Sequence, residues 1–147
     1  MHHPQQLKEA PEEGWFLQLP GAPESIAVAR EFTRKILHSC PNVDAIALVV
    51  SELTTNAVLH SRSGQGGTFR LWLLPLNQGI AVFVYDDGPP TGTTFDRGDV
   101  EDFGRGLQIV EHFATAWGSA GDTPGRHATW ADMPWNTSHD TDSTSAV

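Results

Sequence analysis

The sequence predicts an α+β fold, a two-layer sandwich in which helices cover one face of a mixed, mostly antiparallel sheet. Stretches with helical periodicity and short apolar strand-like runs both occur. They follow one another as hairpins and helices rather than as repeated βαβ units, which favours this class. The 147 residues amount to about one domain, and a hydrophobic fraction of 39% is typical of a soluble globular protein.

Composition divides the chain into three parts. Residues 1–13 are polar with two prolines and are expected to form a flexible leader. Residues 135–147 are rich in Ser, Thr and Asp and are expected to be a disordered tail. Residues 14–134 form the predicted domain.

The first half of the domain reads as one strand followed by two helices. Trp15–Pro20 is an apolar strand, and Pro23 suits the first turn of a helix that continues to about His38. Asn42 is the expected N-cap of a second helix, which ends at Ser61. The apolar residues of this second helix are spaced to cover one face.

Two strands follow, Thr68–Leu74 and Ile80–Asp86, with a turn around Pro75–Gly79. The segment Pro89–Phe103 is rich in Gly, Thr, Pro and Asp and shows neither period. A loop of this length inside a domain is usually functional, and it is often a lid.

A third helix is predicted from about Arg105 to Trp117, with Gly118 as its stop. Two further strands are expected near Ala116–Ala120 and His127–Met133.

Charge and cysteine content limit the functional class. The formal net charge of −9 argues against direct nucleic-acid binding, which needs a basic surface. Cys40 is the single cysteine, so no intramolecular disulfide can form. No apolar run approaches the roughly 18 residues of a membrane helix, and no export signal is visible at the N-terminus. We expect a cytoplasmic protein without a membrane segment.

The most informative motif lies on the second predicted helix. Glu52 and Asn56 are four residues apart and His60 follows at the same spacing, so the three share one edge beside the apolar stripe. An Asn oxygen can be one of the few protein ligands that Mg²⁺ takes when it binds with nucleotide phosphates, and a nearby Glu can orient a hydroxyl. A polar border that only faces solvent is the alternative interpretation.

A second motif ends the strand Ile80–Asp86. Asp86 falls on the same face as Val84, so its carboxylate must find donors or stay near water. The exocyclic amine of adenine is such a donor, and Gly88 would let the backbone approach the ring. An ordinary Asp-Asp-Gly-Pro turn explains the same residues.

A third motif precedes the third predicted helix. Gly104 and Gly106 leave backbone N–H groups accessible at a helix start, which suits a phosphate, and Arg105 could add a charged contact. Glycines also end flexible loops, so this signal is weak by itself. The three motifs in this order together indicate a nucleotide site.

The three motifs resemble the N, G1 and G2 boxes of the GHKL ATPase superfamily, which includes gyrase, Hsp90, histidine kinases and MutL. The resemblance covers roughly residues 14–134 and is nearest to bacterial anti-sigma-factor serine/threonine kinases. The residues that carry it are Glu52 and Asn56, then Asp86 and Gly88, then Gly104, Gly106 and Leu107.

The resemblance implies the Bergerat ATP-binding fold with ATP and Mg²⁺. It gives Glu52 the role of general base and Asn56 the role of Mg²⁺ ligand. Asp86 becomes the adenine anchor. The remaining nucleotide contacts fall on Gly88, Gly104, Arg105, Gly106 and Leu107.

Two departures from the family pattern concern the predicted lid loop and the recognition of the adenine ring. Pro90 stands where the G1 box usually has a second glycine. The family often has a threonine in the last strand that supports the adenine acid, and alignment on Pro134 puts Ala128 there. Thr129 is one residue off and, by strand alternation, on the opposite face, so it becomes a candidate adenine support only with a one-residue bulge.

By this resemblance the protein is expected to phosphorylate a serine or threonine of an anti-sigma-factor antagonist. Free of that antagonist, it would sequester a sigma factor as a homodimer. One alternative is a partner-binding module with a weakened or non-catalytic ATP site. Another is the ATP-binding half of a histidine kinase, which is disfavoured because the leader is too short and polar for a dimerisation helix.

Overall fold

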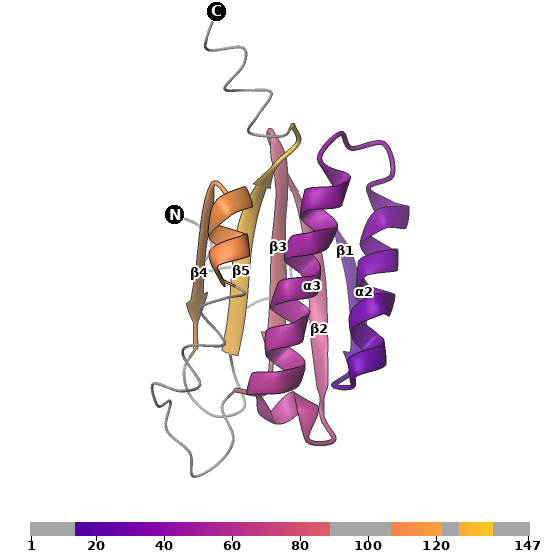
Figure 1. The fold of residues 1–147 in the computed structure, drawn as a ribbon, viewed down its shortest axis with the longest axis vertical. Helices are drawn as coiled ribbons and strands as arrows, with labels where there is room; N and C mark the ends of the chain where they lie inside the picture. The colour runs from indigo at the N-terminus through magenta and orange to yellow at the C-terminus, as the bar shows by residue number, and fades with distance from the viewer. Residues whose placement is uncertain (1–13, 89–106, 122–126, 137–147) are drawn as a thin grey trace, which may run out of the picture.

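The computed structural model describes residues 14–88, 107–121 and 127–136. Residues 107–113 within it are helical. The named elements in chain order are β1 (Trp15–Pro20), α2 (Pro23–Ile36), α3 (Val43–His60), the 3-10 turn η1 (Arg62–Gly64), β2 (Thr68–Leu76), β3 (Gly79–Asp86), β4 (Ala116–Ala120) and β5 (His127–Pro134) (Figure 1).

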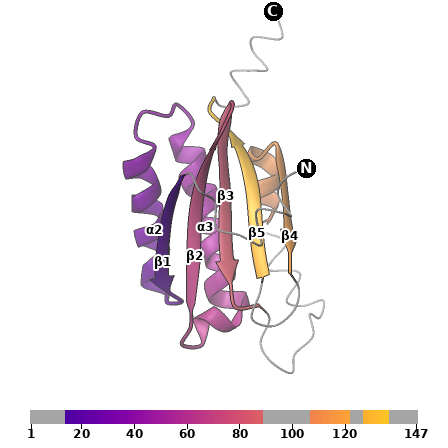
Figure 2. The ribbon, with the colours of Figure 1, turned by 180° about the vertical axis from the view of Figure 1, so that it is seen from behind.

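The five described strands form one sheet in the order β1-β2-β3-β5-β4 (Figure 2). All four neighbouring pairs are antiparallel, so no parallel pair occurs within the described residues. β3 lies at the centre of the sheet, and β1 and β4 form its edges. The predicted α+β sandwich is confirmed.

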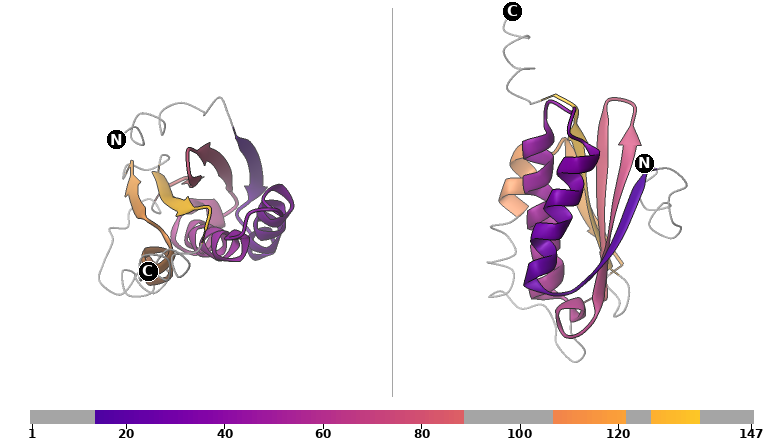
Figure 3. Two further views of the ribbon diagram at one scale, coloured as in Figure 1. Left: turned by 90° about the horizontal axis from the view of Figure 1, so that it is seen from above. Right: turned by 90° about the vertical axis from the view of Figure 1, so that its right-hand side faces the viewer.

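The helices lie together on one face of the sheet (Figures 1 and 3). α3 crosses the middle of that face, and its apolar stripe is buried against the central strands. Most of the core lies between these two layers. Its fully buried members include Ile46, Val50, Leu53, Leu71, Leu73, Ile80 and Val82.

The other face of the sheet carries a second, smaller apolar cluster. Phe83 and Ala81 are fully buried there, with Trp72, Tyr85 and Trp130 packed against them. β3 is therefore apolar on both faces. This explains why its sequence is a continuous apolar run instead of an alternation of apolar and polar residues.

α3 is long and apolar enough to cross a membrane by length and composition, with a mean hydropathy of 1.2 over its 18 residues. The expectation that no apolar run approaches this length was therefore wrong for Val43–His60. In the fold, 56% of this window is buried. Because α3 packs along the sheet, its apolar character is accounted for by the domain core.

The predicted C-terminal end of the third helix was wrong. The helix ends at Phe113, and Trp117 and Gly118 belong to β4. The N–H and hydroxyl groups of Thr115 both donate to the carbonyl of Asp132, which draws the chain onto β5. Trp117 still packs on the helix-side core, so the apolar spacing continues through the change of structure.

Gly118 has a packing role instead of a helix-stopping one. It lies opposite Trp130 in the β4–β5 register, and a Cβ at this position would meet the indole ring at 3.0 Å. The glycine therefore leaves room for the tryptophan.

Asn42 occupies the N-cap position of α3 as predicted, but its side chain does not cap the helix. The side-chain Nδ2 donates to the carbonyl of Pro134 at 3.0 Å, and the backbone N–H donates to the carbonyl of Trp135. Asn42 is buried and ties the start of α3 to the end of β5.

Candidate functional site

The second half of α3 presents the carboxylate and carboxamide of the first motif. Glu52 is half-buried, and desolvation by burial raises the pKa of its carboxyl above the ordinary value. Asn56, one turn later, is 8% exposed. Because both lie at the margin of the buried stripe, neither side chain is a freely solvated polar border.

Asn56 carries a buried polar atom without a partner. Among the described residues its Nδ2 is the one buried side-chain nitrogen or oxygen that makes no hydrogen bond. The neighbouring hydroxyls are satisfied within the helix, because Thr54 and Thr55 donate to carbonyls one turn earlier. A buried unpaired amide costs about 1–3 kcal/mol, so its retention indicates a function for this group.

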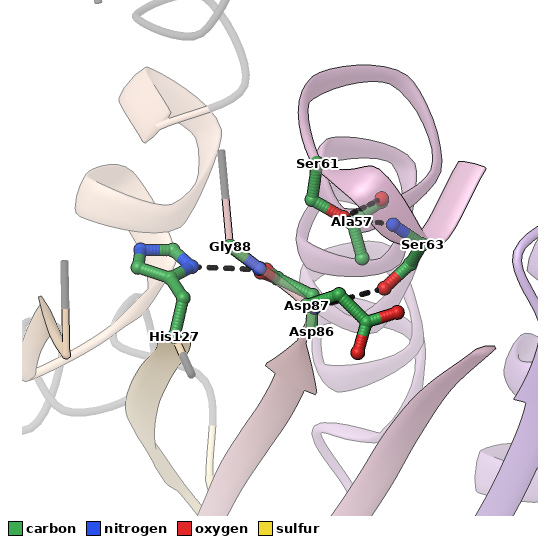
Figure 4. Close-up of polar contacts among 7 residues, drawn as sticks. All are labelled: Ala57, Ser61, Ser63, Asp86, Asp87, Gly88 and His127. Carbon is green, nitrogen blue, oxygen red and sulfur yellow. Dashed lines mark hydrogen bonds and ion pairs between the residues drawn. The ribbon is translucent and has the colours of Figure 1, made fainter. Parts of the chain in front are cut away.

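Asp86 ends β3 as a buried carboxylate, and two described residues contact it. Its Oδ1 accepts the backbone N–H of Gly88 at 2.7 Å, and its Oδ2 lies 2.9 Å from Nδ1 of His127 (Figure 4). Gly88 has a φ of +81°, a left-handed conformation that glycine adopts without strain. Gly88 is thus needed for the turn itself as well as for a close approach to a ligand.

A chain of hydrogen bonds links the end of α3 to this turn (Figure 4). The hydroxyl of Ser61 donates to the carbonyl of Ala57 at 2.6 Å and accepts the N–H of Ser63 at 3.0 Å. The hydroxyl of Ser63 in turn accepts the N–H of Asp87 at 3.0 Å. The helix that bears Asn56 and the strand end that bears Asp86 are therefore held in one arrangement.

Close packing fixes η1, the turn that provides Ser63. A Cβ on Gly64 would overlap the carbonyl oxygen of Val58 in α3. A Cβ on Gly21, between β1 and α2, would overlap the carbonyl oxygen of Ser63. The two glycines let three backbone segments meet at this point, which leaves the Ser63 hydroxyl little freedom to move.

The β3–β5 register decides which face of β5 meets Asp86. His127 pairs with Asp86 and Thr129 pairs with Val84, so both share the helix-side face with the carboxylate. Ala128 pairs with Tyr85 and faces the other way. The expectation that Thr129 faces away without a bulge was therefore wrong, because the regular pairing already places this buried threonine on the side of Asp86.

Gly104, Arg105 and Gly106 of the third motif lie outside the described residues. The predicted lid loop 89–103, which contains Pro90, lies outside them as well. Leu107 is described, half-buried, and packs against the helix-side core. Its assignment as a nucleotide contact stays a prediction.

Sequence reasoning missed two residues of this site, Ser63 and His127. The sequence predicts that the second helix ends at Ser61 and that a strand begins near His127, and neither expectation marks Ser63 or His127 as a site residue. The serine pair two residues apart directly after α3 is typical of local hydroxyl–backbone turns and could have drawn notice. No local signal marks His127, because its partner is 41 residues away.

The arrangement suits a nucleotide with a metal ion. An ionised carboxylate accepts hydrogen bonds only, so Asp86 fits the amine of adenine and disfavours the carbonyl of guanine. An Asn carboxamide can give its oxygen to Mg²⁺ while its N–H groups donate to a phosphate oxygen, which would satisfy the orphaned Nδ2 of Asn56. The donor set present therefore fits Mg²⁺ bound together with phosphates.

Comparison with known proteins agrees with this chemistry. A search of curated proteins found no match. The family model of the histidine kinase-like ATPase domain matches residues 19–131, which span the end of β1 to the middle of β5 and include all three motifs. The chain therefore belongs to the histidine kinase-like ATPase domain family of the GHKL superfamily, as an ATP-binding protein.

Proposed function

We propose that this protein is a serine/threonine protein kinase of the anti-sigma-factor type. It would transfer the γ-phosphoryl group of ATP to an anti-sigma-factor antagonist and, when free of that antagonist, sequester a sigma factor as a homodimer in the cytoplasm. Membership of the family supports ATP-dependent phosphotransfer or ATPase chemistry. The observation that carries the kinase assignment is a partly buried carboxylate, Glu52, one helical turn before the orphaned carboxamide of Asn56.

The residues would have separate roles in phosphoryl transfer, a reaction that mainly requires positioning of the reactants and neutralisation of charge. Asp86 would hold the adenine amine, Thr129 would support it, and Asn56 would hold the metal. Bound Mg²⁺ would neutralise charge on the phosphates. Gly88, Gly104, Arg105, Gly106 and Leu107 would complete the nucleotide contacts.

Glu52 would act as the general base. As the hydroxyl oxygen of the substrate forms its bond to the γ-phosphorus, the bond to the leaving ADP oxygen breaks and the hydroxyl proton passes to the carboxylate of Glu52. Its raised pKa makes Glu52 a stronger proton acceptor than a solvated glutamate. The net charge of −9 would favour a partner with a basic surface.

The test uses γ-labelled ATP, Mg²⁺ and candidate antagonist proteins, with phosphoamino-acid analysis of the product. We expect label on serine or threonine with the wild-type protein. The Glu52→Gln variant should bind ATP normally and transfer at least about a hundredfold more slowly, the usual contribution of a general base. Full transfer by Glu52→Gln would overturn the assignment of Glu52.

A second candidate function is a partner-binding module with a non-catalytic ATP site. It is favoured by Pro90, which replaces the second glycine of the G1 box. ATP binding without transfer to any antagonist, together with ATP-dependent binding of a sigma factor, would support this candidate and contradict the kinase.

A further inference from the structure

His127 forms a direct pair with the predicted adenine anchor. It is the first residue of β5 and lies opposite Asp86, the last residue of β3, so both side chains project from the same face at the same end of the sheet. The distance from Nδ1 to Oδ2 is 2.9 Å. The two side chains are only 13% and 6% exposed, so solvent contributes little to either group.

The hydrogen-bonding inventory sets the direction of this contact. An ionised carboxylate can only accept, so the Nδ1–H of His127 must donate to Oδ2. The other oxygen, Oδ1, already accepts the N–H of Gly88. Within the part of the chain that the structure describes, each oxygen therefore has one protein donor, which leaves a second lone pair on each for a donor of the ligand.

This pairing has a consequence for base selection. The exocyclic amine of adenine can donate to a carboxylate oxygen, whereas guanine shows a carbonyl acceptor at the same position. A donor fixed on Oδ2 holds the plane of the carboxylate, so the remaining lone pairs of Asp86 point in a defined direction. The pair formed by His127 and Asp86 therefore presents an acceptor in one orientation.

We propose that His127 is a positioning residue that restricts the base site to 6-aminopurines, by holding Asp86 as an oriented hydrogen-bond acceptor. This inference rests on the proposed adenine-binding role of Asp86. It does not depend on the kinase activity, because nucleotide binding can be measured without any phosphate transfer.

The experiment compares ATP and GTP affinities, measured by calorimetry with Mg²⁺, for the wild type, His127→Leu and His127→Asn. Leucine removes the donor but keeps apolar bulk. Asparagine keeps an N–H donor, because its Nδ2 and the Nδ1 of histidine are both attached to Cγ. His38→Leu, at an exposed histidine beyond the other end of the helix layer, serves as the control.

We expect His127→Leu to weaken ATP binding on the order of tenfold, as for the loss of one charge-assisted bond, and to lower the ATP-to-GTP preference by a similar factor. His127→Asn should restore most of the preference, and His38→Leu should leave it unchanged. An unchanged preference in His127→Leu, or an equal loss of ATP and GTP affinity, would overturn the proposal. The proposal would also be overturned if His127→Asn did not restore the ATP-to-GTP preference.

A second measurement on the wild type covers the case in which the variants do not fold. Long-range ¹H–¹⁵N spectra of the histidine rings report which nitrogen carries the proton. We expect the Nδ1–H of His127 to be present in the free protein and to remain after ATP is added. Its loss on ATP binding would contradict the positioning role. Normal ATP selectivity without phosphotransfer would refute only the kinase.

Discussion

The hydroxyl oxygen of Ser63 accepts the backbone N–H of Asp87 at 3.0 Å, across 24 residues of sequence. Ser63 is fully buried and is itself fixed to the last turn of α3 through Ser61. The contact thus joins the helix of the first motif to the turn of the second.

Replacement of Ser63 by alanine should loosen that joint. The N–H of Asp87 would lose its acceptor, which costs about 1 kcal/mol of unfolding free energy, and ATP affinity should fall several-fold because the turn is no longer held. Chemical denaturation and calorimetry measure the two effects. Ser119→Ala, at an exposed serine of β4, is the control. Equal behaviour of the two variants would refute the positioning role of Ser63.

Asp86→Asn should reduce ATP affinity by about 2 kcal/mol or more, roughly thirtyfold, because a charge-assisted acceptor is lost. The matched control is Asp87→Asn, one residue later, whose backbone and not its carboxylate makes the contact to Ser63. Calorimetric titration with ATP decides between them. If the two variants lose affinity equally, then general charge and not the specific carboxylate controls binding.

Asn56→Leu should affect protein stability and ATP binding differently. Removal of a buried amide nitrogen without a partner should leave the unfolding free energy unchanged or raise it by about 1 kcal/mol. The same change should abolish the Mg²⁺-dependent part of ATP affinity, because leucine offers no oxygen ligand. Thermal melting and titrations with Mg²⁺ or EDTA test both parts. A strongly destabilised variant would show that Asn56 supports the fold instead of a ligand.

Glu52 should make stability depend on pH in a defined direction. Because its folded pKa is raised, the native state binds more protons than the unfolded state between the ordinary and the raised pKa. The free energy of unfolding therefore falls as pH rises through this window. Glu52→Gln removes the effect, so its melting temperature relative to wild type should increase with pH.

Melting curves from about pH 4 to pH 7 span the ordinary glutamate pKa of about 4.3 and the range above it. Glu31→Gln, at an exposed glutamate of α2, provides the comparison. A difference between Glu52→Gln and wild type that stays constant with pH, or shrinks as pH rises, would contradict the desolvation of Glu52.

Part of this architecture could be predicted from the sequence because it depends on local geometry. A spacing of four residues places Glu52 and Asn56 on one edge of α3 in any helix, and a two-residue period places Asp86 on the face of Val84 in any strand. The five strands and the two named helices follow from the same periodicities. The end of the third helix was misplaced because Trp117 continues the apolar spacing from within β4. The turn predicted around Pro75–Gly79 was too long, because β2 continues to Leu76 and β3 begins at Gly79.

The contacts around Asp86 could not be predicted in this way. His127 reaches the carboxylate, and Thr129 shares its face, only because β3 and β5 pair in one register. A shift of one residue would have exchanged both for Ala128, with no change in the local preference of the strand. The sequence alone therefore determined which side chains share an edge of α3 or a face of β3. The tertiary structure decided their partners, because register and the packing of η1 depend on contacts between segments distant along the chain.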